Sequence, residues 1–250
     1  MRWHTQTERQ SASVLVVRFG VGVLLLLAAS AFAMIALNRA HADAIDIRPP
    51  FLAFVQPIDA ETAKSMESTS WRPGCPVTME DLRAIDMTYW GFDAKPHWGR
   101  LIVHHEVSDA VVRVFKSMYS ARFPIRRMEP VDKYGGSDEA AMEADDTSGF
   151  NCRPVTGGTA WSNHSYGRAI DINTVENPYV KGDVVLPTTG APFVDRTNVR
   201  PGMIVEGDAV TRAFDAEGFI WGARWKTRQD YQHFEIVPPG FHPAGDPPSN

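Results

Sequence analysis

The chain has 250 residues, of which 44% are hydrophobic and 22% are charged. These values are typical of globular proteins and exclude collagen-like, coiled-coil and wholly disordered chains. The net charge is −5, but residues 1–42 carry four arginines against one glutamate, which leaves −8 for the remainder. An acidic body lacks the basic surface that holds phosphates, so no nucleic acid partner is expected.

The amino end has the pattern of a membrane-targeting segment. An uncharged apolar run of 19 residues, Phe19–Leu37, follows Arg2, Arg9 and Arg18. A basic flank directs such a run into a membrane with its amino end inside, and its length approaches the roughly 20 residues that span a bilayer. Small residues at 40–44 also suit signal cleavage. Residues 1–44 are therefore predicted to be a membrane anchor or a removed signal peptide.

Export of the remaining chain is predicted in either case, so the protein is expected in the cell envelope, anchored or secreted. If the amino-terminal segment is kept, it is also the contact with the membrane. The chain has two cysteines, Cys75 and Cys152. In an exported domain an even pair is expected to form a disulfide.

Residues 45–70 are predicted to be a linker, because prolines interrupt them and 61–70 are polar without a strong period. A packed domain is predicted over 71–240. Thr78–Asp81 reads as a capping box that opens a short helix, with Leu82 and Ile85 on its inner face. A strand is expected at 101–103, an amphipathic helix at 107–119 and a further strand at 125–128.

The second half of this domain is predicted to begin with a long loop, since 130–163 carry no pattern of useful length. A short strand is expected at 169–173, a helix at 208–216 that stops at Gly218, and a final strand at 233–237. Residues 241–250 form a tail. Because strands and helices mix without regular βαβ spacing, the prediction is an α+β fold, a small mainly antiparallel sheet with flanking helices.

Two short segments carry the candidate chemistry, 162–173 and 230–235. On a helix, His164 and Asp171 would lie about 10 Å apart along the axis and could not share one metal ion. A turn at Gly167 could instead fold His164 back beside a strand that carries Asp171. Two histidines and one carboxylate with an open position form a known catalytic zinc pattern. The spacing is compatible with such a site without requiring it.

The two segments together resemble a known family. Ser-x-His-x-x-Gly-x-Ala-x-Asp, from Ser162 to Asp171, precedes Asp-x-x-His-Phe-Glu, from Asp230 to Glu235. This pair of motifs resembles the M15 zinc peptidases, the D-alanyl-D-alanine carboxypeptidases and L-alanyl-D-glutamate endopeptidases that trim peptidoglycan, and the resemblance extends over about 71–238. It implies a fold like that of the DD-peptidases and the hedgehog domain.

The resemblance also implies roles for individual residues. His164, Asp171 and His233 would be the ligands of Zn²⁺, and Asp230 the catalytic base. The family uses an arginine to hold the substrate or the developing anion. Arg126, Arg127 and Arg153 are the candidates for that role here, and Arg127 and Arg153 rank together.

The function expected from the resemblance is a zinc metallopeptidase of the D-Ala-D-Ala carboxypeptidase type, a monomer that acts on peptidoglycan peptides in cell-wall remodelling. An L-Ala-D-Glu endopeptidase is the alternative within the family. Outside it, the alternatives are a catalytically silent, zinc-stabilised wall-binding module and a structural wall protein with incidental histidines. Asp230 favours turnover, because a pure binder has no need of that carboxylate.

Four further interpretations concern side chains near these motifs. Ser162 is expected to shape the turn. Glu235 either orients a ligand histidine or faces solvent. His104 and His105 are expected to be structural. Three tryptophans either line a substrate groove or fill the core: Trp161, Trp221 and Trp225.

Overall fold

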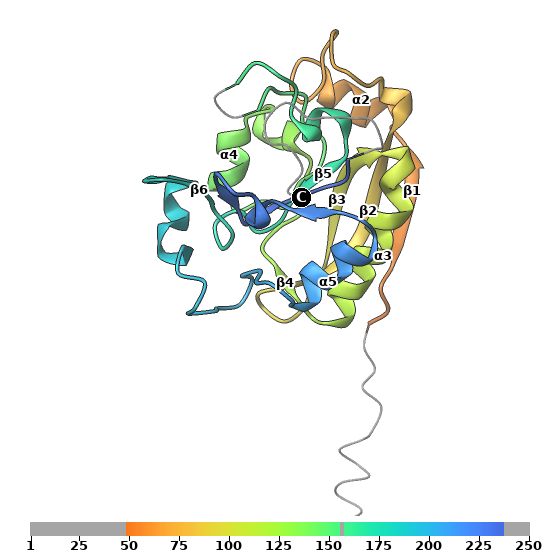
Figure 1. Ribbon diagram of the computed structural model, residues 1–250. Helices are drawn as coiled ribbons and strands as arrows, with labels where there is room; N and C mark the ends of the chain where they lie inside the picture. The colour runs from red at the N-terminus through yellow and green to blue at the C-terminus, as the bar shows by residue number, and fades with distance from the viewer. Residues whose placement is uncertain (1–48, 156–157, 238–250) are drawn as a thin grey trace, which may run out of the picture. The chain divides into compact units, whose positions relative to one another are not determined.

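A sheet with one long antiparallel pair forms the first half of the computed structural model, which describes residues 49–155 and 158–237 (Figure 1). The predictions for the amino-terminal segment 1–44 and for the tail 241–250 lie outside the described residues. Within the described ranges, no helix has the length and apolar character needed to cross a membrane.

The long pair consists of β2 (Leu82–Gly91) and β3 (Pro96–His104). β1 (Ala53–Pro57) pairs antiparallel with the outer edge of β2, and the two-residue β4 (Pro124–Ile125) pairs parallel with the end of β2. Alternate residues of β2 and β3 point into the main hydrophobic core, as the two-residue side-chain period of a strand requires.

Helix α3 (Ser108–Ser120) covers the core face of this sheet and packs against α5 (Ala209–Ala216). Its buried residues, Val111, Val114, Phe115 and Met118, recur at helical spacing. The side chain of Asp208 accepts a hydrogen bond from the Thr211 amide and begins α5. Both helices were predicted from sequence and are confirmed.

Two three-stranded antiparallel sheets form the second half of the described chain, from Ala169 to Glu235. One has the order β5–β10–β8, with β5 at Ala169–Asp171, β10 at His233–Glu235 and β8 at Ile220–Trp221. The other has the order β7–β6–β9, with β7 at Val184–Leu186, β6 at Tyr179–Lys181 and β9 at Gln229–Asp230.

Residues 148–150 link the two halves. The Phe150 amide donates to the Ile102 carbonyl of β3 at 2.7 Å, and Ser148 pairs with Asp171 of β5. The sheet edge of the first half is thereby joined to β5. Small antiparallel sheets with a few helices confirm the predicted α+β class.

Short helical segments fill the connections between these elements. The α-helical ones are α2 (Ala60–Met66) and α4 (Asp138–Glu143). The 3₁₀ turns are η1 (Met79–Asp81), η2 (His105–Val107), η3 (Val131–Tyr134), η4 (Asn163–Tyr166), η5 (Thr188–Phe193) and η6 (Gly222–Arg224).

The predicted linker at 45–70 is wrong over its described part. β1 and α2 occupy this stretch, and Met66 at the end of α2 is fully buried. The prolines that suggested a linker flank an edge strand, where a missing amide is tolerated. The domain therefore begins well before residue 71.

Three other expectations need correction. The capping box at Thr78 is present, but it opens only η1, and Leu82 and Ile85 are buried in strand β2 instead of on a helix. The long loop predicted at 130–163 contains α4, which Ser137 caps by accepting from the Ala140 amide. Of the strand expected at 125–128, β4 retains only its first residue, although Met128 makes an isolated bridge to Thr147.

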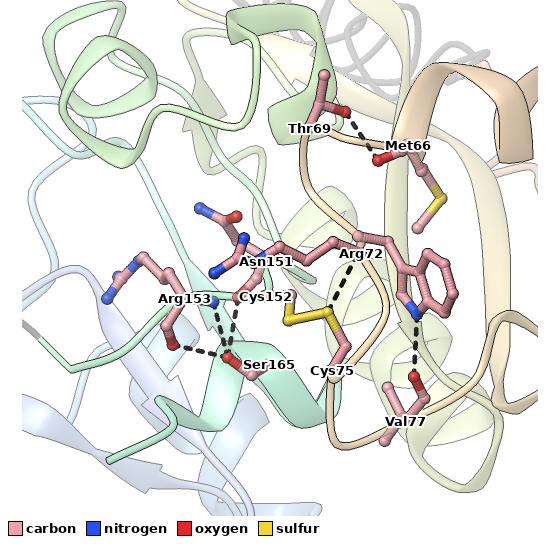
Figure 2. The surroundings of a disulfide bond; sticks show 10 residues. Met66, Thr69, Arg72, Cys75, Val77, Asn151, Cys152, Arg153 and Ser165 are labelled. Atoms are coloured by element: carbon pink, nitrogen blue, oxygen red, sulfur yellow. Dashed lines mark hydrogen bonds between the residues drawn. A yellow bond between two sulfur atoms is a disulfide. The ribbon is translucent and has the colours of Figure 1, made fainter. Parts of the chain in front are cut away.

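The predicted disulfide between Cys75 and Cys152 is present (Figure 2). It lies beside a second, smaller core that includes Met66, Leu82 and Phe150. The bond joins the loop before η1 to the segment that follows the 148–150 link. On either side of Cys152, Asn151 and Arg153 contact the turn that carries His164.

Candidate metal centre

The η4 turn folds the first motif back on itself. The Ser162 hydroxyl accepts a hydrogen bond from the His164 amide, in the turn role expected for it. Gly167 then adopts a left-handed φ of +64°, and a Cβ there would come within 2.6 Å of the His104 amide nitrogen. Glycine is therefore required twice over, by its backbone conformation and by space. The reversal returns the chain so that His164 lies beside Asp171 of β5.

Strand register supplies the third side chain. β10 pairs antiparallel with β5, and His233 stands directly opposite Asp171. The His233 Nδ1 atom lies 3.0 Å from Asp171 Oδ1, and His164 Nε2 lies 3.2 Å from both Asp171 Oδ2 and His233 Nδ1. All three residues are buried. The structure thus brings together the three side chains proposed from the motifs.

The remaining nitrogen of each imidazole has its own partner. His164 Nδ1 donates to the Gly149 carbonyl at 2.6 Å, and His233 Nε2 lies 3.1 Å from Glu235 Oε2. Asn163 Nδ2 donates to the same Glu235 oxygen at 2.5 Å. Such partners fix the tautomer and orientation of metal-binding histidines. Of the two interpretations of Glu235, the contact with His233 is the one observed.

The electrostatics of the cluster favour a cation. Burial alone would lower the pKa of His233, but hydrogen bonds to Asp171 and Glu235 outweigh it and raise the pKa to about 10. Burial would raise the pKa of Asp171, but the two histidines hold it well below its usual range. Asp171 and Glu235 therefore stabilise a positive charge at His233. A metal ion can supply this charge in place of the proton.

Asp230 lies next to the cluster on β9, three residues before His233. Its Oδ1 atom is buried and has no hydrogen-bond partner among residues 49–155 and 158–237. Burial raises the pKa of Asp230 to about 6, with further effects from His233 and Asp171. A carboxylate with a pKa near neutrality and an unused oxygen can accept and return a proton.

The structure separates the arginine candidates. Arg153 pairs with Asp138 of α4 at 2.7 Å, and its charge opposes the burial-induced rise of the Asp230 pKa. Arg126 pairs with Asp145 and Glu176. Arg127 is exposed. Its positive charge has a pKa-lowering effect on three other groups, Tyr89, Tyr134 and Asp146. Of these interactions, the effect of Arg153 on Asp230 is the one that reaches a residue beside the cluster.

A second group, Asp81, His104 and His105, also has the composition of a metal site. His104 Nδ1 accepts the Glu106 amide hydrogen at 3.2 Å, so the proton of the neutral ring sits on Nε2. His105 Nδ1 lies 3.1 Å from the Asp81 carbonyl. These bonds cap η2 and tie it to η1, which agrees with the structural role expected for the two histidines.

A comparison with protein families bears on the first cluster. The family model described as D-alanyl-D-alanine carboxypeptidase, of the M15 peptidases, matches residues 156–236. The match supports an M15 family peptidase. It covers about a third of the chain and contains the η4 turn, β5, β9 and β10, so the resemblance drawn from the motifs is confirmed over this segment. No solved structure matches the chain.

An M15 peptidase is a hydrolase, and the buried His164, Asp171 and His233 form a possible metal site within the matched segment. The turn at Gly167 was anticipated from sequence as the way to bring His164 to Asp171. For Trp225, the sequence left a groove-lining and a core-filling position open, and the structure places its ring centroid 5.3 Å from that of His233. Its sequence signal, a tryptophan five residues before Asp230, does not distinguish a site residue from a core residue.

Proposed function

We propose that this chain is a zinc-dependent peptidase of the D-Ala-D-Ala carboxypeptidase type that trims peptidoglycan stem peptides outside the cytoplasmic membrane. The observation that carries the proposal is the convergence of His164, Asp171 and His233. Beside them lies a buried carboxylate oxygen of Asp230 that has no partner in the described part of the chain. The disulfide and the kind of family matched both suit an extracytoplasmic location.

The donor set fits zinc. Two imidazoles and one carboxylate leave a fourth position open, as catalytic zinc sites do. The nitrogens that face the centre are His164 Nε2 and His233 Nδ1, because the opposite nitrogen of each ring contacts Gly149 or Glu235. When bound, zinc would act as a Lewis acid on the scissile carbonyl and make a water molecule more acidic.

Residues of the chain then transfer the proton of the attacking water and stabilise the negative charge of the substrate. Asp230 takes a proton from the attacking water and later passes it to the amine of the leaving D-alanine, which its raised pKa permits. Arg153, held by Asp138, offers a cation for the substrate's terminal carboxylate or for the developing oxyanion. Burial of the cluster strengthens each of these interactions.

The test is mass spectrometry of muropeptides incubated with the full chain, with and without a chelator. We expect loss of the terminal D-alanine, abolished by the chelator and restored by zinc. Cleavage between L-alanine and D-glutamate would instead identify the endopeptidase of the same family. Intact muropeptides in every condition would refute a peptidase acting on this substrate.

Substituting His164→Ala is expected to remove the metal, because it deletes one of three ligands at a buried position. Elemental analysis of the purified variant should show zinc falling from about one per chain to a trace. His97→Ala is the matched control, since His97 is exposed and pairs with Asp93 on a distant hairpin. A variant with His164→Ala that still holds one tightly bound zinc would contradict the ligand assignment.

Glu235→Gln is expected to weaken zinc binding by about 10- to 100-fold, because it removes the negative charge that orients and polarises His233. Competition with a zinc chelator measures this affinity directly. Glu106→Gln provides the control, as Glu106 is an exposed carboxylate paired with Arg168. Equal zinc affinities in wild type and the Glu235→Gln variant would reduce Glu235 to a packing role.

A further inference from the structure

The turn η6 and the residue after it lie against the candidate metal centre. A Cβ added to Gly222 would meet Asp230 Cβ at 2.8 Å and His233 Cβ at 3.2 Å. Only glycine therefore lets this turn approach the base and the ligand so closely. The turn is further tied down by Trp221, whose Nε1 donates to the Tyr231 carbonyl at 2.9 Å.

Trp225 caps the end of η6 and brings its ring close to the centre. Its ring centroid lies 5.3 Å from that of His233, and the guanidinium carbon of Arg228 lies 4.3 Å from the Trp225 ring centroid. The neighbouring Trp221 is 4% exposed and belongs to the main core, whereas Trp225 is partly exposed and is not a member of it. The indole is thus held in place beside a ligand histidine without serving the core.

The turn that leads to Trp225 contacts both Asp230 and His233 through Gly222. The proposed function has Asp230 deliver a proton to the leaving amine, so the leaving residue must lie on the Asp230 side. Gly222 contacts Asp230 directly, and Trp225 follows three residues later from the same turn. A partly exposed indole, on a turn that contacts the proposed base, therefore lies beside the ligand His233.

We infer that Trp225 is a specificity-determining residue that restricts the leaving residue to a small side chain such as that of D-alanine. This inference rests on the proposed function and deepens it. A rigid indole beside the centre excludes a branched side chain by volume, whereas a methyl group can pack on its surface. Pocket contacts of this kind discriminate between substrates by about 10-fold or more for each added carbon.

The test compares two synthetic acyl dipeptides, one ending in D-Ala-D-Ala and one in D-Ala-D-Leu. We expect Trp225→Ala to raise the kcat/KM for the D-Leu substrate relative to the D-Ala substrate by about 10-fold or more. Trp98→Ala, which removes an exposed indole stacked on Phe54, is the control and should leave the ratio unchanged. A uniform loss of activity on both substrates would indicate a merely structural tryptophan and overturn the inference.

A binding measurement separates this inference from the peptidase proposal. In zinc-loaded Asp230→Asn protein, titration with the acylated D-Ala-D-Ala peptide should quench tryptophan fluorescence. Adding Trp225→Phe should remove most of the quench, while adding Trp98→Phe should not. Failure of the wild type to cleave either peptide would refute the proposed function. An unchanged quench in the Trp225→Phe protein, or no quench before that substitution, would refute the role of Trp225.

Discussion

Asp230→Asn is expected to lower kcat on a D-Ala-D-Ala substrate by about 10²- to 10⁴-fold while zinc stays bound. Asparagine has nearly the shape of aspartate, which matters because Gly222 crowds the Asp230 Cβ. The amide cannot accept and return a proton as the carboxylate does. Asp230 is also not among the three residues whose ligand atoms converge, so the metal should remain.

Two measurements check this expectation together, steady-state hydrolysis and zinc content by elemental analysis. Asp93→Asn serves as the control, since Asp93 is an exposed carboxylate that pairs with His97. Full activity in the Asp230→Asn protein would remove Asp230 from the mechanism. Loss of zinc together with activity would instead reassign Asp230 as a residue needed to hold the metal.

Removing the disulfide is expected to cost the protein about 4.5 kcal/mol of unfolding free energy. Cys75 and Cys152 are separated by 77 positions, and closing a loop of that length restricts the unfolded chain by about this amount in the chain-entropy model. The double substitution Cys75→Ser and Cys152→Ser should therefore lower the midpoint of urea unfolding markedly. The bond lies within the small core, of which Cys152 is a member, and Asn151 and Arg153 flank that cysteine (Figure 2).

Removing the disulfide should also weaken zinc binding at the candidate metal centre. The Asn151 amide donates to the His164 carbonyl, and the Arg153 amide donates to the Ser165 hydroxyl. Releasing Cys152 frees both neighbours, so we expect weaker zinc binding as well as lower stability. Reductant added to wild type should reproduce the defect but leave the double variant unchanged. Equal unfolding midpoints for the oxidised wild type and the double variant would contradict this account.

The sequence predicted those elements whose structure depends on interactions between residues close together in the chain. The apolar spacing of 107–119 predicted α3, and Asp208 and Gly218 predicted the ends of α5, because periodicity and caps act within a few residues. The close approach of His164 to Asp171 was anticipated as an option, because a glycine between them permits a reversal. The motif pair then identified which His and Asp residues to consider.

Other features depended on contacts between distant segments. Residues 53–57 form a strand only because β2 offers an edge, and nothing local to Pro57 indicates that edge. The position opposite Asp171 is set by the pairing of β5 with β10, whose residues lie about 60 positions apart. Arg153 is favoured over Arg127 because its charge acts on Asp230, which is 77 positions away and which no pattern local to Arg153 indicates.

The pairing of β10 with β5 also determines when the centre can exist. His164 and Asp171 occur in the middle of the chain, whereas His233 stands near its carboxyl end on the strand that must insert between β5 and β8. A polypeptide still being synthesised or translocated lacks that strand and so has only two of the three side chains. Hydrolytic capacity would therefore be withheld until the last strand has been made and has docked between β5 and β8.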